Sequence, residues 1–186
     1  MEFEIKFSAP KSAILDAIAA KTDGAMHIFE METTYFDTPN GALSAKKLML
    51  RRRLENGVSV ITCKTPAKGY ARGEWDVQAD DPLAALPSLI AQGAPGELRH
   101  IAALVPVCGA RFTRRAFKLA LDGCTAELAL DSGVLFRGET VLPLCEVELE
   151  LKAGDSLPLL AFANELAARY GLTEEKRSKF ARARAL

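Results

Sequence analysis

The sequence of 186 residues lacks the features that would mark a redox or zinc protein, a membrane protein or a general nucleic-acid binder. Its four cysteines form no CxxC pair and have no metal-ligand spacing, so we interpret them as buried free thiols. No apolar run reaches the roughly 18 residues of a membrane span. The net charge is zero, with 24 basic and 24 acidic side chains, whereas a nucleic-acid binder usually has a basic excess.

The N-terminal segment also lacks a basic stretch followed by an apolar run. No signal peptide is therefore expected, and the cytoplasm is the predicted location. Hydrophobic residues make up 49% of the chain and charged residues 26%, which is the balance of an ordinary globular protein. Residues 1–186 are expected to form a single domain, because a chain of this length can bury a sizeable core.

Polar and apolar residues alternate over many short stretches, which predicts about eight β-strands. Asn56-Gly57 and Asp122-Gly123 each lie between two such stretches and are typical of hairpin turns. A further turn is expected at Ser132-Gly133. Helices are expected within the segments 11–21, 81–104 and 155–170. Since there is no βαβ rhythm and no Gly-rich phosphate loop, we expect an α+β fold in which an antiparallel sheet closes into an eight-stranded β-barrel with flanking helices.

Charged residues within the expected strands are two positions apart and therefore share a face. Glu146, Glu148 and Glu150 share one face of a strand, and Arg51 and Arg53 share one face of another. The same spacing is found for Glu2, Glu4 and Lys6, for Thr62 and Lys64, for Arg72, Glu74 and Asp76, and for Glu127 and Asp131. Two interpretations are open: a sheet with one solvated face, on which opposite charges pair across strands, or a barrel with a polar interior.

The grouping of like charges favours the polar interior. Three carboxylates in a row repel one another at about 5–7 Å, and a divalent metal ion relieves this repulsion because hard ions bind carboxylate oxygens. Neighbouring arginines repel one another because both are positively charged. A polyphosphate relieves this repulsion, because guanidinium groups bind phosphate bidentately. Both clusters around one cavity would suit metal-assisted phosphoryl transfer. Mg²⁺ or Mn²⁺ would bridge phosphate oxygens, Arg and Lys would hold the chain, and a further carboxylate would orient or deprotonate water.

Several short motifs also occur in a fixed order along the chain. Glu2-Phe3-Glu4-Ile5-Lys6 has the form ExExK, and residues 145–152 read CEVELELK. The other motifs are Tyr35-Phe36-Asp37-Thr38-Pro39, Leu50-Arg51-Arg52-Arg53, Lys64, Arg72-Gly73-Glu74-Trp75, Arg114, Glu127, Asp131 and Ser178-Lys179. Together these motifs resemble the CYTH superfamily of triphosphate tunnel metalloenzymes over nearly the whole chain. ExExK alone arises by chance, but its coincidence with the other motifs in the same order is specific.

The resemblance implies an eight-stranded tunnel, open at both ends, that holds a divalent metal ion and a triphosphate. By this resemblance, the catalytic residues would be Glu2, Glu4 and Lys6. The substrate-binding residues would be Lys6, Arg51, Arg53, Lys64, Arg72, Arg114 and Lys179. The metal-side residues would be Glu2, Glu4, Glu127, Asp131, Glu146 and Glu148, with Glu74 in a supporting role.

Two motifs depart from the family pattern. The C-terminal tail reads SKFARARAL without the Gly-Tyr of the family, and residues 72–74 read RGE instead of RPE. Some bacterial members continue into a helical CHAD domain, whereas this sequence ends before one. It is therefore open whether the chain is a stand-alone protein or a piece of a longer one.

Three activities occur in the family, and we expect hydrolysis of inorganic triphosphate. Class IV adenylate cyclase is the first alternative, and hydrolysis of thiamine triphosphate or a nucleoside triphosphate is the next. A polyphosphate-binding tunnel without catalysis is less favoured, because its carboxylates would oppose anion binding in the absence of metal. The expected partner is a small molecule such as tripolyphosphate, ATP or thiamine triphosphate, not a nucleic-acid polymer or a membrane. The oligomeric state is left open.

Overall fold

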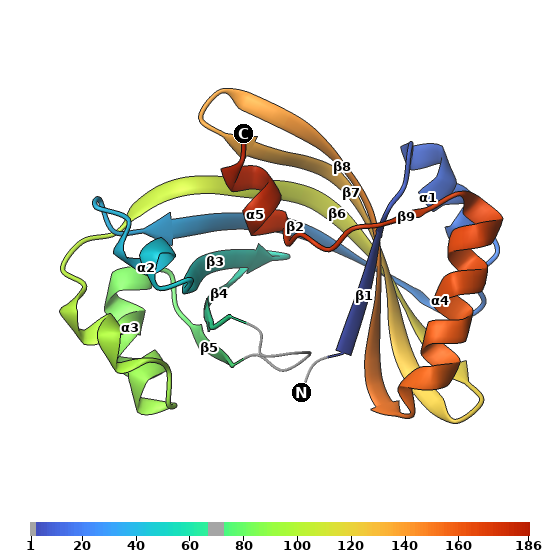
Figure 1. Ribbon diagram of the computed structural model, residues 1–186, viewed down its shortest axis with the longest axis horizontal. Coiled ribbons are helices and arrows are strands. Elements are labelled where there is room, and N and C mark those ends of the chain that lie inside the picture. Colours follow the sequence, from blue (N-terminus) through green and yellow to red (C-terminus); the bar gives the residue numbers. More distant parts are fainter. Residues whose placement is uncertain (1–2, 67–72) are drawn as a thin grey trace.

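The computed structural model describes residues 3–66 and 73–186, and one antiparallel sheet of nine strands forms its framework. The strand order is β5-β4-β3-β2-β6-β7-β8-β1-β9. The strands are β1 (Phe3–Ser8), β2 (Met26–Asp37), β3 (Met49–Glu55), β4 (Val58–Lys64), β5 (Glu74–Gln78), β6 (Val105–Leu121), β7 (Cys124–Arg137), β8 (Thr140–Gly154) and β9 (Thr173–Glu174). Figure 1 shows the sheet bending into an arch, with β3, β4 and β5 on one side and β1 on the other.

The expected α+β architecture on an antiparallel sheet is confirmed, but the sheet has nine strands rather than eight. The ninth is the two-residue strand β9, which pairs with the edge of β1 that β8 leaves open. Within the described residues, no ladder joins β5 to β1 or β9, so the ring of hydrogen bonds does not close. The tunnel arises from the curvature of one long sheet, whose long strands accumulate twist.

Most of the helices lie on the outer side of the arch at its two ends, whereas the C-terminal helix packs against β6 and β7 beside the tunnel cavity (Figure 1). The helices are α1 (Ser12–Ala19), α2 (Ala42–Ala45), α3 (Pro82–Ala91), the 3₁₀ helix η1 (Gly96–His100), α4 (Ser156–Tyr170) and α5 (Lys179–Arg184). Leu15 of α1 and Leu159 of α4 are fully buried in a core with Leu128 of β7 and Leu149 of β8. A second core joins α3 and η1 to β3 and β4. These apolar contacts cover one face of the sheet at both ends of the arch, and the charged side chains lie on the other face, next to a third apolar cluster that includes Tyr35, Phe112 and Ala183.

Capping residues in the local sequence explain where α3 and α4 begin and where α4 ends. The carboxylate of Asp81 accepts hydrogen bonds from the Leu83 and Ala84 amides and caps α3, and Pro82 occupies the first helical position. Asp155 caps α4 in the same way, and Gly171 ends it in the left-handed conformation. The expected short helices within 81–104 are therefore present as α3 and η1. No helix among the described residues is long and apolar enough to cross a membrane.

Two of the three expected turns are confirmed. Asn56 and Gly57 both have positive φ, at 48° and 84°, and join β3 to β4, and Gly123 at φ 86° joins β6 to β7. The prediction of a turn at Ser132-Gly133 is wrong, because strand β7 continues through both residues. A Cβ atom at Gly133 would lie 2.2 Å from the Arg111 carbonyl oxygen of β6. The glycine is thus explained by the close approach of two strands and not by a turn.

Candidate active site

The register of the ladders brings the charged residues of separate strands onto one face of the sheet. Residues directly opposite each other in an antiparallel pair point to the same side. Glu4 of β1 pairs with Glu150 of β8, and Glu150 pairs with Glu127 of β7. Lys6 pairs with Glu148 in the same way. Carboxylates from three neighbouring strands therefore meet side by side on the inner face.

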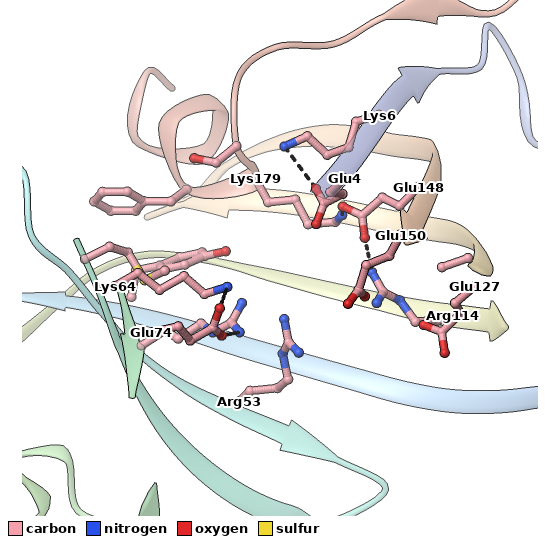
Figure 2. A pocket seen from close by; sticks show the side chains of 16 residues that line it. Glu4, Lys6, Arg53, Lys64, Glu74, Arg114, Glu127, Glu148, Glu150 and Lys179 are labelled. Atoms are coloured by element: carbon pink, nitrogen blue, oxygen red, sulfur yellow. Dashed lines mark hydrogen bonds and ion pairs between the residues drawn. The ribbon is translucent and has the colours of Figure 1, made fainter. Parts of the chain in front are cut away.

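The other arm of the arch contributes mainly cations. Arg51 lies opposite Tyr35 of β2, and Lys64 of β4 lies opposite Glu74 of β5. Arg53 is two residues after Arg51 and so points to the same side. The two arms face each other across the bore, so the basic cluster lies across from the acidic one (Figure 2).

A cavity of about 150 Å³ lies between the arms. Among the residues that the structure describes, six cationic side chains line it, namely Lys6, Arg51, Arg53, Lys64, Arg114 and Lys179. Five carboxylates line it as well, namely Glu4, Glu74, Glu127, Glu148 and Glu150. The lining thus carries a net charge of about +1, although it holds eleven ionisable groups of both signs.

A largely buried ion-pair network forms one wall of the cavity. Arg114 donates two hydrogen bonds of 2.8 Å to the carboxylate of Asp131 and a third to Glu148. The Lys179 ammonium lies 2.8 Å from Asp131 and 2.7 Å from Glu148, and it also contacts Glu146. Arg182 donates a hydrogen bond to the second oxygen of Glu146. Three carboxylates whose oxygens lie within 4.8 Å of one another are therefore compensated by three cationic side chains from β6 and α5.

The network changes the proton affinities of its members. Burial alone would raise the pKa of Glu148, but the charges of Lys179 and Arg114 outweigh it and lower that pKa well below its ordinary value. Burial would lower the pKa of Lys179, but the carboxylates of Glu148, Asp131 and Glu146 raise it. Glu148 and Lys179 are thus held as an ion pair at neutral pH.

The basic arm has a different charge balance. Glu74 lies 2.5 Å from the Lys64 ammonium and 3.6 Å from the Arg51 guanidinium. Arg53 forms no ion pair with any described carboxylate, and Figure 2 shows its guanidinium pointing into the cavity. The Nε atoms of Arg51 and Arg53 are buried without a hydrogen-bond acceptor. Burial, then the nearby charges of Arg51 and Arg114, lower the pKa of Arg53 to about 10.

Most of the predicted site residues meet at this cavity. Those that line it are Glu4, Lys6, Arg51, Arg53, Lys64, Glu74, Arg114, Glu127, Glu148 and Lys179. Asp131 and Glu146 do not line it and lie behind its wall, where both are fully buried. Glu2 and Arg72 lie outside the described residues. The catalytic, metal-binding and substrate-binding roles stay predictions, and the structure provides their geometry.

Three ionisable residues of the cavity or its wall were not among the predicted ones. Glu150 lines the cavity. Its position two residues after Glu148 places it on the same strand face and could have predicted this. Tyr35 also lines it, and burial raises its pKa against the opposing charges of Arg51, Lys179 and Arg53. Arg182 lies in the C-terminal tail that departs from the family pattern. Its contact with Glu146 had no signal in the sequence, because it depends on where α5 docks.

Comparisons with known proteins can now be set beside this geometry. A family model described as the CYTH domain matches residues 1–183. The chain belongs to the CYTH family. It is also similar to a curated inorganic triphosphatase of Haemophilus influenzae, at 28% identity over 137 residues. That match spans 72% of this chain but only 39% of the relative.

Solved structures of other proteins share the fold. A Hippeastrum protein, described as a putative adenylyl cyclase with a dominant triphosphatase activity, superposes with a TM-score of 0.69 at 21% identity. The alignment covers 100% of this chain and 96% of the Hippeastrum chain. A protein from Pyrococcus horikoshii superposes with a TM-score of 0.60 at 18% identity over 97% of this chain and 96% of its own. These similarities show that the arch described above is the CYTH tunnel fold.

The donor set of this CYTH tunnel fits a hard divalent cation. Glu4, Glu127, Glu148 and Glu150 all present carboxylate oxygens to the cavity, which are the ligands that Mg²⁺ and Mn²⁺ prefer. Two of these carboxylates already form ion pairs with cationic side chains. Glu4 lies 3.5 Å from the Lys6 ammonium, and Glu150 lies 2.7 Å from the Lys152 ammonium. No thiolate lines the cavity among the described residues, which argues against a soft metal ion.

Proposed function

We propose that this CYTH chain hydrolyses inorganic triphosphate with the help of a divalent metal ion. The observation that carries the proposal is the half-buried Arg53 side chain, whose guanidinium points into the cavity without a carboxylate partner among the described residues and whose Nε atom is buried without an acceptor. The unsatisfied Nε atom of Arg51 lies beside it on the same strand. Buried donors are costly unless an acceptor satisfies them, and guanidinium groups bind phosphate oxygens strongly. A phosphate chain meets this requirement.

The other cations extend the phosphate site around Arg53. Lys64 and Arg51 share the Glu74 carboxylate, which keeps both side chains oriented towards the bore. Lys6 reaches the cavity from the opposite arm. We propose that these residues bind phosphate oxygens directly. Arg114 and Lys179 add positive potential from the wall, while their ion pairs keep the buried carboxylates in place.

The charge balance of the cavity supports the need for a metal ion. The lining residues that the structure describes have a net charge of about +1, whereas a triphosphate carries several negative charges, so these side chains alone leave much of that charge uncompensated. Glu4, Glu127, Glu148 and Glu150 are the proposed Mg²⁺ or Mn²⁺ ligands, with Asp131 and Glu146 behind them. When bound, the metal would neutralise charge on the phosphate oxygens as the terminal bond breaks.

Hydrolysis also requires an oriented water molecule. Glu4 is the proposed group that accepts a hydrogen bond from this water and takes its proton, and the Lys6 ammonium, 3.5 Å away, forms an ion pair with the Glu4 carboxylate. The water oxygen attacks the terminal phosphorus, the bond from that phosphorus to the bridging oxygen breaks, and orthophosphate and pyrophosphate leave. The proton then passes from Glu4 to solvent. The Arg53 and Lys64 cations stabilise the charge on the departing pyrophosphate.

The choice of inorganic triphosphate rests on the curated relative and on the small cavity. The Haemophilus influenzae protein is an inorganic triphosphatase. The polar cavity of about 150 Å³ suits a phosphate chain and its ions better than it suits a nucleoside. Adenylate cyclase and thiamine triphosphatase activity remain the alternatives, and the Hippeastrum protein illustrates how one fold carries both a cyclase description and a triphosphatase activity.

A parallel assay tests the proposal. The purified chain is incubated with tripolyphosphate, ATP or thiamine triphosphate, each with Mg²⁺, Mn²⁺ or EDTA, and orthophosphate, pyrophosphate and cyclic AMP are measured. We expect orthophosphate and pyrophosphate in equal amounts from tripolyphosphate with metal, and none with EDTA. Cyclic AMP from ATP as the main product would establish the cyclase alternative. Tight metal-free binding of tripolyphosphate without any product would establish a binding protein instead.

A further inference from the structure

A second hollow, of about 570 Å³, adjoins the central cavity next to α5. The two spaces share four lining residues, namely Met49, Lys64, Ser178 and Phe180. Figure 2 shows Lys64 on the far side of the cavity from Glu127 and Glu150, which are two of the proposed metal ligands. The α5-side hollow therefore begins at the Lys64 end of the cavity, away from those carboxylates.

The charges that line the α5-side hollow are all of one sign. Among the described residues, its lining holds the cations Lys47, Lys64 and Arg184 and no carboxylate. The Arg184 guanidinium lies 3.1 Å from the carboxylate of Asp37, which is outside the lining and orients Arg184. Lys47 is exposed and forms no ion pair with a described residue. The hollow thus presents positive charge to any anion that extends from the central cavity.

Lys47 has a backbone conformation that is uncommon for a lysine. Its φ is 56°, and its amide donates a hydrogen bond of 2.9 Å to the Ser44 carbonyl oxygen where the chain leaves α2. Glycine or asparagine adopts this conformation more readily. The local backbone therefore does not explain a lysine here, whereas its side chain, which lines the hollow, gives it a role in binding an anion.

The hollow on the side of the β3–β4 hairpin has a different charge. It shares Arg51, Arg53 and Glu74 with the central cavity. Its lining adds the carboxylates Glu55 and Asp76 and no further cation among the described residues. An anion that is too long for the central cavity therefore meets added positive charge on the α5 side and added negative charge on the hairpin side.

We infer that the α5-side hollow is a subsite for the additional phosphates of linear polyphosphates longer than triphosphate, and that Lys47 and Arg184 bind them. This inference rests on the proposed function, in which Lys64 stabilises the departing pyrophosphate. A longer chain adds its phosphates to this leaving group, at the Lys64 end where the hollow begins. At about 570 Å³, the hollow is larger than the cavity of about 150 Å³ that is proposed to hold triphosphate.

The reaction of a longer chain follows the same steps. Water attacks the terminal phosphorus, the bond from that phosphorus to the bridging oxygen breaks, and Glu4 passes the proton to solvent. Tetrapolyphosphate is thereby converted to orthophosphate and tripolyphosphate. Phosphorus NMR after a single turnover should show these two products in equal amounts. Two pyrophosphates from each tetrapolyphosphate would show that the chain lies differently and would overturn the inference.

The main test compares kcat/KM for tetrapolyphosphate and for tripolyphosphate, both with Mg²⁺, in the wild type, Lys47→Gln and Lys47→Glu. We expect the ratio of tetrapolyphosphate to tripolyphosphate kcat/KM to fall about threefold in Lys47→Gln and about tenfold in Lys47→Glu, because solvent partly screens this exposed charge. Lys46→Glu is the matched control. Lys46 is the preceding exposed lysine, lies 3.6 Å from Glu97 and lines neither space.

Several outcomes would contradict the subsite. They are an unchanged ratio in Lys47→Glu, equal losses for both substrates, and a wild type that hydrolyses tripolyphosphate but not tetrapolyphosphate. A wild-type preference for ATP over tetrapolyphosphate would assign the hollow to an organic group and would also overturn the inference. If the wild type hydrolyses neither polyphosphate, the proposed function fails. Calorimetry then tests the subsite by itself, with tetrapolyphosphate expected to bind more tightly than tripolyphosphate in the wild type and to lose this advantage in Lys47→Glu.

Discussion

Arg114 of β6 holds Asp131 of β7 by two hydrogen bonds of 2.8 Å each, and the Asp131 side chain has no solvent exposure. The two residues lie directly opposite each other in the ladder, so their bidentate pairing is a consequence of strand register. The same Asp131 carboxylate also lies 2.8 Å from Lys179 of α5. This one side chain therefore connects the sheet to the C-terminal helix and supports the wall of the active-site cavity.

Asp131→Asn should destabilise the fold strongly. The substitution leaves Arg114 and Lys179 buried with one carboxylate fewer, and removal of one partner from a buried ion pair costs about 3–5 kcal/mol. Urea denaturation should show a lower midpoint with an unchanged slope. The control is Glu165→Gln, which breaks the exposed 2.6 Å pair with Arg169 on α4 and should cost about 0.5 kcal/mol or less. Equal stabilities of the two variants would show that the network contributes nothing to folding.

Glu4→Gln should abolish phosphate release and leave the fold intact. The amide has almost the shape of the carboxylate but cannot accept the proton of the attacking water and binds a divalent metal weakly, so kcat should fall by about 100-fold or more. Phosphate release is measured with tripolyphosphate, and the thermal midpoint is measured beside it. The exposed Glu139→Gln in the β7–β8 turn is the matched control. Normal turnover of Glu4→Gln would remove the proposed mechanism.

Arg53→Ala should lower kcat/KM for tripolyphosphate by about 10- to 100-fold, as expected for the loss of charge-assisted hydrogen bonds to phosphate. Arg53→Lys should recover part of this loss, because it keeps the charge but not the two-pronged geometry. Arg52→Ala is the control, since Arg52 is next in sequence and points to the opposite face of β3. If Arg53→Ala and Arg52→Ala have the same kcat/KM, Arg53 does not belong to the site.

Asp37 should make the stability of the fold depend on pH. Its buried carboxylate accepts hydrogen bonds from the Thr38 and Leu43 amides, from the Ser44 hydroxyl and from Arg184 of α5. Burial alone would raise the pKa of Asp37, but these bonds lower it below its ordinary value of 3.8. The unfolded chain therefore binds the proton more readily than the folded one. The contribution of Asp37 is fully present above pH 3.8 and is lost as the pH falls through the folded-state pKa.

The measurement is the free energy of unfolding of wild type and Asp37→Asn between pH 7 and pH 3. At pH 7 the variant should be about 1–3 kcal/mol less stable, and the difference should shrink as the pH falls below 3.8. Exposed Asp80→Asn should show a difference near zero throughout. A gap between wild type and Asp37→Asn that is constant with pH would show that the charge of Asp37 is not what stabilises the α2 and α5 contacts.

Much of the site followed from the sequence because strands have a period of two. Glu4, Arg53 and Glu148 each lie in a strand in which polar and apolar residues alternate. Each side chain can therefore point to only one of the two faces of the sheet, and the helix-covered face takes most of the apolar residues. The wrong prediction of a turn at Ser132-Gly133 shows where a local sequence pattern is not sufficient. A glycine next to serine is typical of a turn, but it equally permits a close approach between strands, and only the partner strand decides between the two.

The sequence by itself determined the antiparallel α+β class, the Asn56-Gly57 hairpin and the sets of like charges that share each strand face, because these depend on neighbours two to four residues apart. Tertiary structure decided which carboxylates line the cavity and which are buried behind its wall. Glu150 faces the bore, whereas Glu146, with the same spacing, is buried by Lys179 and Arg182. That difference depends on where α5 docks some thirty residues later in the chain, and no local pattern encodes a contact made across such a distance.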